Sequence, residues 1–299
     1  MRNAFIEELV QAASANEKIA LVVGDLGYGV VEPFAKKFPK RFFNAGVAEQ
    51  NMMGLSAGLA SEGFHVFAYS IANFPTFRCA EQIRNDVDYH QLPVTIVAVG
   101  GGVAYGNLGY SHHAIQDYAL MRAMPNMLIA SPGDPMEVRA CMRYLIQNPQ
   151  PSYLRLGKSG EKNLHKKVPE VAPGKWLQLS ANHAYTGKTL LTTGAPLALA
   201  KNWLDSNPAY QGFAINSLPL WGMKWKSMQK DQVIDWQETI AVEDHLLDGG
   251  FGSWLMESLI SDPALLLRLR FKYLDSSICG LVGKQEILNS RGGLETYVD

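Results

Sequence analysis

The sequence predicts an α/β protein with two domains, each a mostly parallel sheet flanked by helices. The chain has 299 residues, 47% of them hydrophobic, so it can bury a sizeable core and exceeds the roughly 100 to 200 residues of one domain. Short β-branched runs alternate with amphipathic stretches along the chain, a pattern typical of parallel sheets covered by helices. The alternation is interrupted once, near the middle of the chain, by a segment rich in Gly, Pro and Lys.

Strands and helices are expected in alternation before this interruption. The expected strands are short apolar runs at 19–25, 63–70, 92–99, 126–131 and 151–156. The expected helices are residues 3–14, 49–61, 76–89, 115–123 and 135–147. The last of these helices begins at Asp134-Pro135, where Asp suits the cap position and Pro suits the first turn.

The interruption reads GKSGEKNLHKKVPEVAPGKW, residues 157–176, and is longer than an ordinary connection. We therefore place one domain at residues 1–160, a linker at 161–180 and a second domain at 181–299. The second domain is expected to contain strands at 188–194, 210–216, 238–244 and 268–274, with helices near 195–205, 227–234 and 249–259.

Composition excludes several classes of function. The formal net charge is −1 at pH 7 with no long block of one sign, so neither nucleic acid nor a membrane surface is expected as a partner. Cys79, Cys141 and Cys279 are widely spaced and indicate neither a disulfide framework nor a zinc site. Glu7 and Glu8 lie where a signal peptide would need an apolar core. A cytoplasmic protein that binds a small molecule or another protein is expected.

Ligands of open α/β sheets collect beyond the carboxyl ends of the strands. The loops expected there are GDLGYG (24–29), NAGVAEQ (44–50), YSIANFP (69–75) and GGGVAYGNLGYSHH (100–113). None has the spacing of a dinucleotide or P-loop fingerprint. The glycines of the last loop nevertheless allow the backbone to approach a ligand closely.

The expected helix at 49–61 begins with an acid, Glu49, and carries Gly54 and Gly58 on one face. Each interior glycine costs about 1 kcal/mol relative to alanine, so something should approach this face closely. Tight packing on its own sheet is one interpretation, and a subunit interface near Glu49 is the other. Glu49 itself has a structural explanation, because an acid at a helix start is favoured by roughly 0.3 to 1 kcal/mol.

The segment FFNAGVAEQNMMGLSAGLASEGFHVFAYSIANFPTFRCAEQIRND, residues 42–86, resembles the pyrimidine-binding domain of the transketolase family. In that family a G(I/V)AEQ-type motif carries the glutamate that activates thiamine diphosphate. The likeness continues through LPVTIVAVGGGVAYGNLGYSHHAIQDYALMRAMPNMLIASPGDPMEV, and VEDHLLDGGFGS at 242–253 resembles the family's C-terminal domain. The resemblance implies an enzyme that transfers a two-carbon ketol unit between a ketose, or ketose phosphate, and an aldose-like acceptor.

The resemblance assigns roles near the cofactor to three residues. Glu49 matches the catalytic glutamate, which hydrogen-bonds N1′ of the aminopyrimidine ring. Phe74 matches the aromatic that stacks on this ring, although Phe77 is close enough to compete, and either could be a core residue. Asp25 matches an aspartate close to the cofactor, and a turn role is its structural alternative.

Four further residues are assigned to catalysis and substrate binding in the same way. His112 matches the histidine that faces the donor and the reacting centre, and His113 is placed beside it as a substrate contact. A metal site on this histidine pair is disfavoured, because adjacent side chains point apart and no Cys or acid cluster joins them. Arg2 matches an arginine that contacts phosphate, and Lys158 stands where the family has a second one.

Two departures from the family pattern concern the substrate. Gly100 and Leu108 stand where many transketolases have a histidine and an aspartate that recognise donor hydroxyls and acceptor phosphate. Lys158 can neutralise a phosphate but cannot form the bidentate fork of an arginine. These departures put the usual sugar phosphates in doubt.

A third departure concerns the cofactor's other half. Transketolases hold the diphosphate and Mg²⁺ with a GDG…N segment, and no GDG occurs in these 299 residues. The resemblance therefore implies the C-terminal half of a split transketolase, with no metal ligands of its own. Its expected partners are a diphosphate-binding subunit that supplies the Mg²⁺ ligands and a second copy of this chain, in a heterotetramer.

Two alternatives stay open at this stage. One is a subunit of a deoxyxylulose-phosphate-synthase-like or 2-oxo-acid-decarboxylating thiamine enzyme. The other is a non-catalytic assembly subunit that has kept the fold, against which the presence of Glu49, Phe74 and His112 argues.

Overall fold

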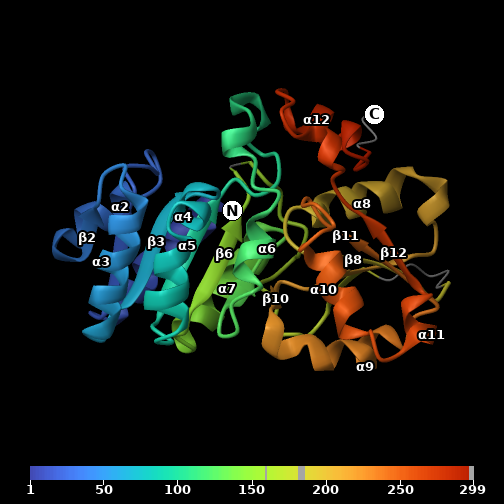
Figure 1. Cartoon of the computed structure of the whole chain (residues 1–299), viewed down its shortest axis with the longest axis horizontal. Helices are drawn as coiled ribbons and strands as arrows, with labels where there is room; N and C mark the ends of the chain where they lie inside the picture. Colours follow the sequence, from blue (N-terminus) through green and yellow to red (C-terminus); the bar gives the residue numbers. More distant parts are fainter. Residues whose placement is uncertain (159, 181–185, 296–299) are drawn as a thin grey trace.

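The computed structural model describes residues 1–158, 160–180 and 186–295. Two sheets lie side by side, with the N-terminal half of the chain around one and the C-terminal half around the other (Figure 1). Both sheets are mostly parallel and flanked by helices, which confirms the predicted fold class. In the described part of the chain, no helix is long and apolar enough to cross a membrane.

The first sheet has the strand order β10-β5-β6-β4-β3-β1-β2. All of its pairs are parallel except β10 with β5. Its strands are β1 (Ile19–Val23), β2 (Phe42–Asn44), β3 (His65–Ile71), β4 (Val94–Val99), β5 (Leu128–Ala130), β6 (Ser152–Leu156) and β10 (Leu220–Trp221). Its helices are α1 (Arg2–Ala15), α2 (Glu32–Lys37), α3 (Glu49–Ser61), α4 (Phe74–Phe77), α5 (Ala80–Gln82), α6 (Asp117–Met121) and α7 (Pro135–Gln147).

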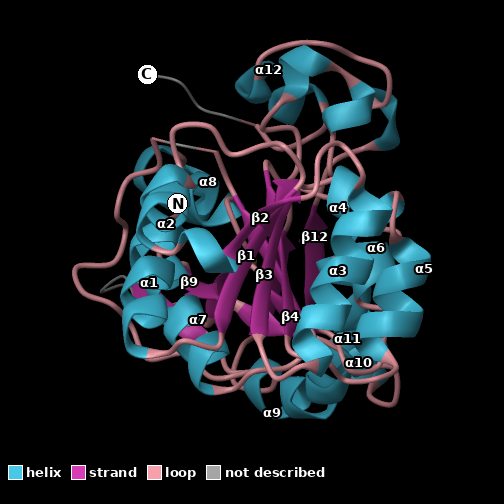
Figure 2. Cartoon of the chain, turned by 90° about the vertical axis from the view of Figure 1, so that its left-hand side faces the viewer, coloured by secondary structure: helices cyan, strands magenta, loops and turns pink. Residues whose placement is uncertain are grey.

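Both faces of this sheet are covered, as its continuous apolar strands require. Along β1, Ala20 and Val22 join the core on the α3 side, whereas Ile19, Leu21 and Val23 join the core on the α1 and α7 side. Figure 2 shows α3 to α6 on one side of the sheet and α1, α2 and α7 on the other. Covered faces leave the strand ends as the place where a ligand can reach the sheet.

The second sheet has the order β12-β11-β8-β9-β7, in which only β7 runs antiparallel to its neighbour. Its strands are β7 (Leu177–Ser180), β8 (Lys188–Thr192), β9 (Ala214–Ser217), β11 (Glu238–Val242) and β12 (Leu269–Lys272). The helices of this half are α8 (Pro196–Ser206), α9 (Gln229–Val233), α10 (Phe251–Ser258), α11 (Pro263–Leu266) and α12 (Gln285–Arg291).

The helices expected at 49–61 and 135–147 have these bounds in the structure, as α3 and α7. The continuous helix expected at 76–89 is wrong. It is divided into α4, α5 and a π-helical turn at Ile83–Asp88, because the backbone leaves the helical region at Cys79 (φ −129°, ψ 29°). This break orients the chain between Phe74 and Arg78 at the end of β3.

Three short strands form where the sequence predicts none. The first, β2, pairs with β1 just before α3. β7 lies within the expected linker at 161–180 and pairs with β9, and β10 crosses from the second half of the chain to the edge of the first sheet. A strand of two residues has no periodicity to detect, and its pairing depends on where tertiary packing places it. The two halves therefore share a sheet edge as well as a linker.

Candidate functional site at the carboxyl edge of the first sheet

The predicted site residues follow successive strands of the first sheet at one edge. Asp25 follows β1, Glu49 begins α3 just after β2, and Phe74 begins α4 just after β3. His112 and His113 lie in the loop after β4. Because carboxyl ends of parallel strands meet at one edge, five residues distant in sequence reach the same region.

Glu49 is buried although it carries a carboxylate, with 4% of its surface exposed. It is the first residue of α3, whose N-terminal end favours a negative charge. An open hollow of about 540 Å³ lies over it, lined by Val47, Ala48, Gln50, Asn51 and Arg78. A buried acid beneath an open hollow is a suitable arrangement for a ligand that brings its own hydrogen-bond donor.

Arg78 occupies this position in the structure. Its Nη1 donates to Glu49 Oε1 at 2.7 Å, and its guanidinium carbon lies 4.1 Å from the centre of the Phe74 ring. A planar cation with N–H donors is thus held between the acid and the aromatic face. Half of the Arg78 side chain is exposed, so it can leave without unfolding the site.

His112 also contacts Phe74. The two rings meet edge to face, with centroids 5.2 Å apart, and the His112 Nδ1 lies 3.0 Å from Ser111 Oγ. Partial burial, and then the positive charges of His113 and Arg78, lower the pKa of His112 below its usual value. The ring is therefore neutral near pH 7 and can exchange a proton with a ligand. Phe77, the competing aromatic, is half exposed and makes no such ring contact with the described residues.

His113 is turned away from this cluster. It has no exposed surface, its ring faces Tyr110, and its Nε2 lies 3.4 Å from the Gly106 carbonyl oxygen. Burial lowers its pKa. In this conformation His113 offers a substrate no surface, and its contacts are those of a loop anchor.

Asp25 lies in a tight turn with φ at 55°. Its Oδ1 accepts from Asn44 Nδ2 at 2.9 Å and from the Tyr28 hydroxyl at 3.1 Å, and its backbone N–H donates to Asn44 Oδ1. These bonds tie the end of β1 to the end of β2, just before α3 begins. They match the turn role of Asp25, and its side chain makes no described contact with Glu49.

Arg2 and Lys158 lie at a separate corner, where the N-terminus meets the end of β6. Met1 contacts the Gly157 backbone, and Arg2 lies beside Tyr69, whose pKa burial raises to about 12 while the Arg2 charge opposes the rise. Lys158 Nζ lies 3.4 Å from the Ala104 carbonyl oxygen. The predicted phosphate contacts thus form a cationic corner distinct from the Glu49 cluster.

The glycine face of α3 does not pack on its own sheet. A Cβ placed on Gly54 or Gly58 would meet nothing within 4 Å, and both residues are exposed. The face borders a hollow lined also by Ala57, Ser61 and Asp86. Tight packing of these glycines on their own sheet is therefore the wrong interpretation. The other interpretation, a subunit interface on this face, stays a prediction.

Sequence reasoning missed Arg78. The signal was present, because Arg78 lies four residues after Phe74, one helical turn away, in a stretch with few charges. It also missed Arg155, a single charge inside the apolar strand SYLRL. Among the described residues, no group of three or more His, Cys, Asp or Glu side chains could hold a metal ion.

Residues 1–161 match the protein family described as "Transketolase, pyrimidine binding domain". This match covers more than half of the chain and includes every element around Glu49. The chain belongs to the transketolase family. The family domain is named for the pyrimidine ring of thiamine diphosphate, so its presence in this transketolase-family chain implies use of that cofactor.

Relatives of this transketolase-family chain include parts of divided enzymes. A "Putative transketolase C-terminal section" from Methanocaldococcus jannaschii is 32% identical, over 99% of this chain and 92% of that protein. One subunit of an apulose-4-phosphate transketolase from Phocaeicola vulgatus is also 32% identical, over 88% of this chain and 84% of that one. A 1-deoxy-D-xylulose-5-phosphate synthase from Aquifex aeolicus is 30% identical over 97% of this chain, but only 46% of the synthase is covered.

A solved structure with the same fold is described as "Split gene transketolase, inactive beta4 tetramer". It aligns with a TM-score of 0.83 and 30% identity, covering 98% of this chain and 93% of that one. The resemblance to transketolase subunits that the GVAEQ motif indicated is therefore confirmed across both halves of the chain.

Proposed function

We propose that this chain is the pyrimidine-binding subunit of a two-subunit transketolase. With its partner it transfers a two-carbon ketol unit from a ketose, or ketose phosphate, to an aldose-like acceptor. The observation that carries the proposal is the Glu49–Arg78–Phe74 arrangement. It holds a planar cation with N–H donors where the family places the aminopyrimidine ring of the cofactor.

The residues present fit this cofactor. Glu49 offers a buried acceptor for a ring N–H, Phe74 offers an aromatic face, and the hollow above Glu49 is open. When bound, thiamine diphosphate supplies the carbon nucleophile that takes up the ketol unit. Glu49 would hold and return the proton at the ring nitrogen.

Other residues of the chain would act on the substrate. His112, neutral and next to Phe74, is placed to accept or donate a proton at a hydroxyl or carbonyl of the donor. Arg2 and Lys158 would hold an anionic end of the substrate at the cationic corner. Asp25 would act by fixing the turn that precedes α3.

A separate subunit would hold the diphosphate and supply the Mg²⁺ ligands. The sequence has no GDG segment, and relatives of similar length are named as a section or a subunit of a transketolase. A second copy of this chain would cover the Gly54 and Gly58 face, to which no described part of the chain itself is packed. A tetramer formed by the similar solved chain supports such self-association.

The rival function is that of a synthase or decarboxylase acting on a 2-oxo acid. It is favoured by the similarity to 1-deoxy-D-xylulose-5-phosphate synthase and by Gly100 and Leu108 at the two family positions for substrate recognition. Lys158, in place of an arginine, is compatible with either function.

Donor choice separates these functions. We expect the chain, combined with a GDG-containing partner, Mg²⁺ and thiamine diphosphate, to convert hydroxypyruvate and an aldose into the ketose longer by two carbons, measured by mass spectrometry. Decarboxylation of pyruvate without ketol transfer would instead establish the rival. A complex that assembles and binds cofactor but converts neither donor would identify a non-catalytic subunit.

Removal of the Arg78 guanidinium should tighten cofactor binding. The Glu49 ion pair is partly exposed and the cation–π contact is at the surface, and each is worth up to about 1 kcal/mol. A cofactor that replaces Arg78 must give up both contacts. We expect Arg78→Ala to lower the Kd of the complex for thiamine diphosphate about tenfold, which corresponds to ~1.4 kcal/mol, as measured by calorimetry.

Arg84→Ala is the matched control. Arg84 is exposed on the same segment and donates only to Asn85 among the described contacts, so its removal should leave the Kd unchanged. Weaker binding in Arg78→Ala would show that Arg78 contacts the bound cofactor, and an unchanged Kd would show that it does not compete for the site.

A further inference from the structure

The glycine loop, residues 100–114, carries His112 and lies between the two halves of the chain. Its base follows β4, and its tip faces α12. The Glu49 cluster consists of Glu49, Phe74, Arg78 and His112. No described residue of the second domain belongs to it, yet this domain contacts the loop at both base and tip. The contacts at each end are specific enough to fix where the loop lies.

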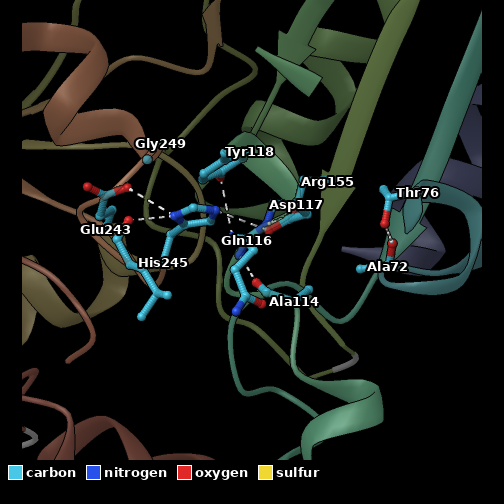
Figure 3. A network of polar contacts seen from close by, with 12 residues as sticks. Ala72, Thr76, Ala114, Gln116, Asp117, Tyr118, Arg155, Glu243, His245 and Gly249 are labelled. Carbon is cyan, nitrogen blue, oxygen red and sulfur yellow. Dashed lines mark hydrogen bonds and ion pairs between the residues drawn. The ribbon is translucent and has the colours of Figure 1, made fainter. Parts of the chain in front are cut away.

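At the base, Arg155 contacts the loop and residues of both domains. Figure 3 shows Arg155 beside Asp117. The Arg155 Nε donates to Asp117 Oδ2 at 2.7 Å, its Nη1 to Asp244 Oδ1 at 2.6 Å, and its Nη2 to the Ala114 carbonyl oxygen at 2.8 Å. Ala114 in turn closes the loop by two backbone hydrogen bonds with Gly102, of 2.9 and 2.8 Å. Asp244 lies two residues after the end of β11 in the second domain, so a second-domain carboxylate orients the arginine that holds the loop.

These groups are fully removed from water. The side chains of Arg155, Asp117 and Asp244 are 2%, 0% and 3% exposed, so each charge depends on its partners for stabilisation. Only glycine suits position 102. A Cβ there would lie 2.4 Å from Asp244 Oδ2, and the backbone φ of +64° is in the left-handed region. The base of the loop cannot shift without disturbing Asp244.

A histidine completes the packing around Asp117. The ring of His245 stacks on Tyr118, and its Nε2 lies 3.8 Å from Asp117 Oδ1. Burial lowers the pKa of His245 to about 4, so this ring is neutral. The Asp117 Oδ2 atom instead accepts from Arg155 at 2.7 Å and from the Tyr153 hydroxyl at 2.6 Å, so two residues of β6 hold its charge.

At the tip, residues of the second domain pack against Gly106. The Gly283 N–H donates to the Gly106 carbonyl oxygen at 3.2 Å, and the same oxygen faces His113 Nε2 at 3.4 Å. A Cβ at Gly106 would lie 2.4 Å from Leu288 Cδ1, on α12. His112 follows between these two attachments, with its ring against Phe74.

We propose that the second domain is a clamp that positions His112, with Asp244 acting through Arg155 at the base of the loop and the Gly283–Leu288 segment acting at its tip. The inference rests on the proposed function, because that function makes His112 a substrate contact whose position matters. Asp244, Arg155 and Leu288 are positioning residues that touch neither substrate nor cofactor. Substrate contact by His112 would then depend on the second domain.

Hydrogen–deuterium exchange of the whole chain tests the clamp without cofactor or partner. Asp244→Asn keeps an acceptor for Arg155 but removes the charge, and Gly106→Ala places a methyl group against Leu288. In each variant we expect amides of residues 102–113 to exchange at least tenfold faster, while β4 keeps its wild-type protection. Unchanged loop exchange in both variants would overturn the proposal, as would equal acceleration of the loop and β4.

Glu257→Gln is the control for a lost contact between domains. Glu257 on α10 binds Arg122, which directly follows α6, at 2.7 and 2.9 Å, and this pair touches no part of the loop. It should leave the exchange of residues 102–113 unchanged. If Asp244→Asn fails to fold, the loop exchange of Gly106→Ala, which removes no charge, tests the clamp by itself.

A second readout in the assembled complex separates positioning from general damage. Exchange of the cofactor's C2 proton depends on Glu49, whereas ketol transfer also needs His112. We expect Gly106→Ala to leave C2 exchange within about twofold of wild type and to lower transfer at least tenfold, which is about 1.4 kcal/mol. Parallel losses would contradict the clamp. A wild-type complex that shows neither C2 exchange nor ketol transfer would instead refute the proposed function. Hydrogen–deuterium exchange of residues 102–113 would still test the clamp in that case.

Discussion

Glu49→Gln in the assembled complex should lower turnover by more than about 100-fold, the low end for the loss of one acid–base group. Glutamine is nearly isosteric with glutamate, but its amide cannot take up and return the proton at the cofactor's ring nitrogen. The fold should survive, because the charge at the start of α3 contributes only roughly 0.3 to 1 kcal/mol and glutamine Oε1 can still accept from Arg78. Exchange of the cofactor's C2 proton with solvent deuterium measures the loss directly.

Glu62→Gln is the control for this variant. Glu62 caps the other end of the same helix, and its side chain is exposed, so its replacement should leave C2 exchange and turnover at wild-type levels. Wild-type C2 exchange in Glu49→Gln would remove Glu49 from catalysis and would leave only its structural role at the helix start.

We expect the chain without its partner to bind thiamine diphosphate poorly and to transfer no ketol unit. In the proposed site, the chain would supply one ring hydrogen bond from buried Glu49 and one stacking face from Phe74. The charged diphosphate needs a metal and further ligands to offset its loss of water, and the described residues contain no metal-binding group. We expect the partner with Mg²⁺ to raise the affinity at least about 100-fold, equivalent to ~2.7 kcal/mol.

Titration calorimetry of the isolated chain, with cofactor and Mg²⁺ but without partner, measures this difference. A second titration on the complex of Glu49→Gln with the partner shows whether assembly alone restores diphosphate binding. Micromolar affinity of the isolated chain together with measurable ketol transfer would establish a complete site within one chain. The split-enzyme proposal would then be wrong.

The sequence by itself determined what depends on local pattern. Hydrophobic alternation was sufficient for the fold class and for α3 and α7, because each has its own start signal and a continuous periodic run. The helical pattern at 49–61 placed Glu49 at a helix start, which is where the structure has it. The rule that ligands bind beyond the carboxyl ends of parallel strands singled out the loops that carry Asp25, Glu49, Phe74 and His112.

Only the tertiary structure decided how these side chains meet. Phe74, rather than Phe77, faces His112, with ring centroids 5.2 Å apart, and helix propensity alone could not separate these two aromatics of α4. Contacts between residues far apart in the chain leave no periodic signal in either segment. The Arg78–Glu49 pair spans 29 positions and the Arg155–Asp244 pair spans 89, so three-dimensional packing alone brings each pair within hydrogen-bond distance.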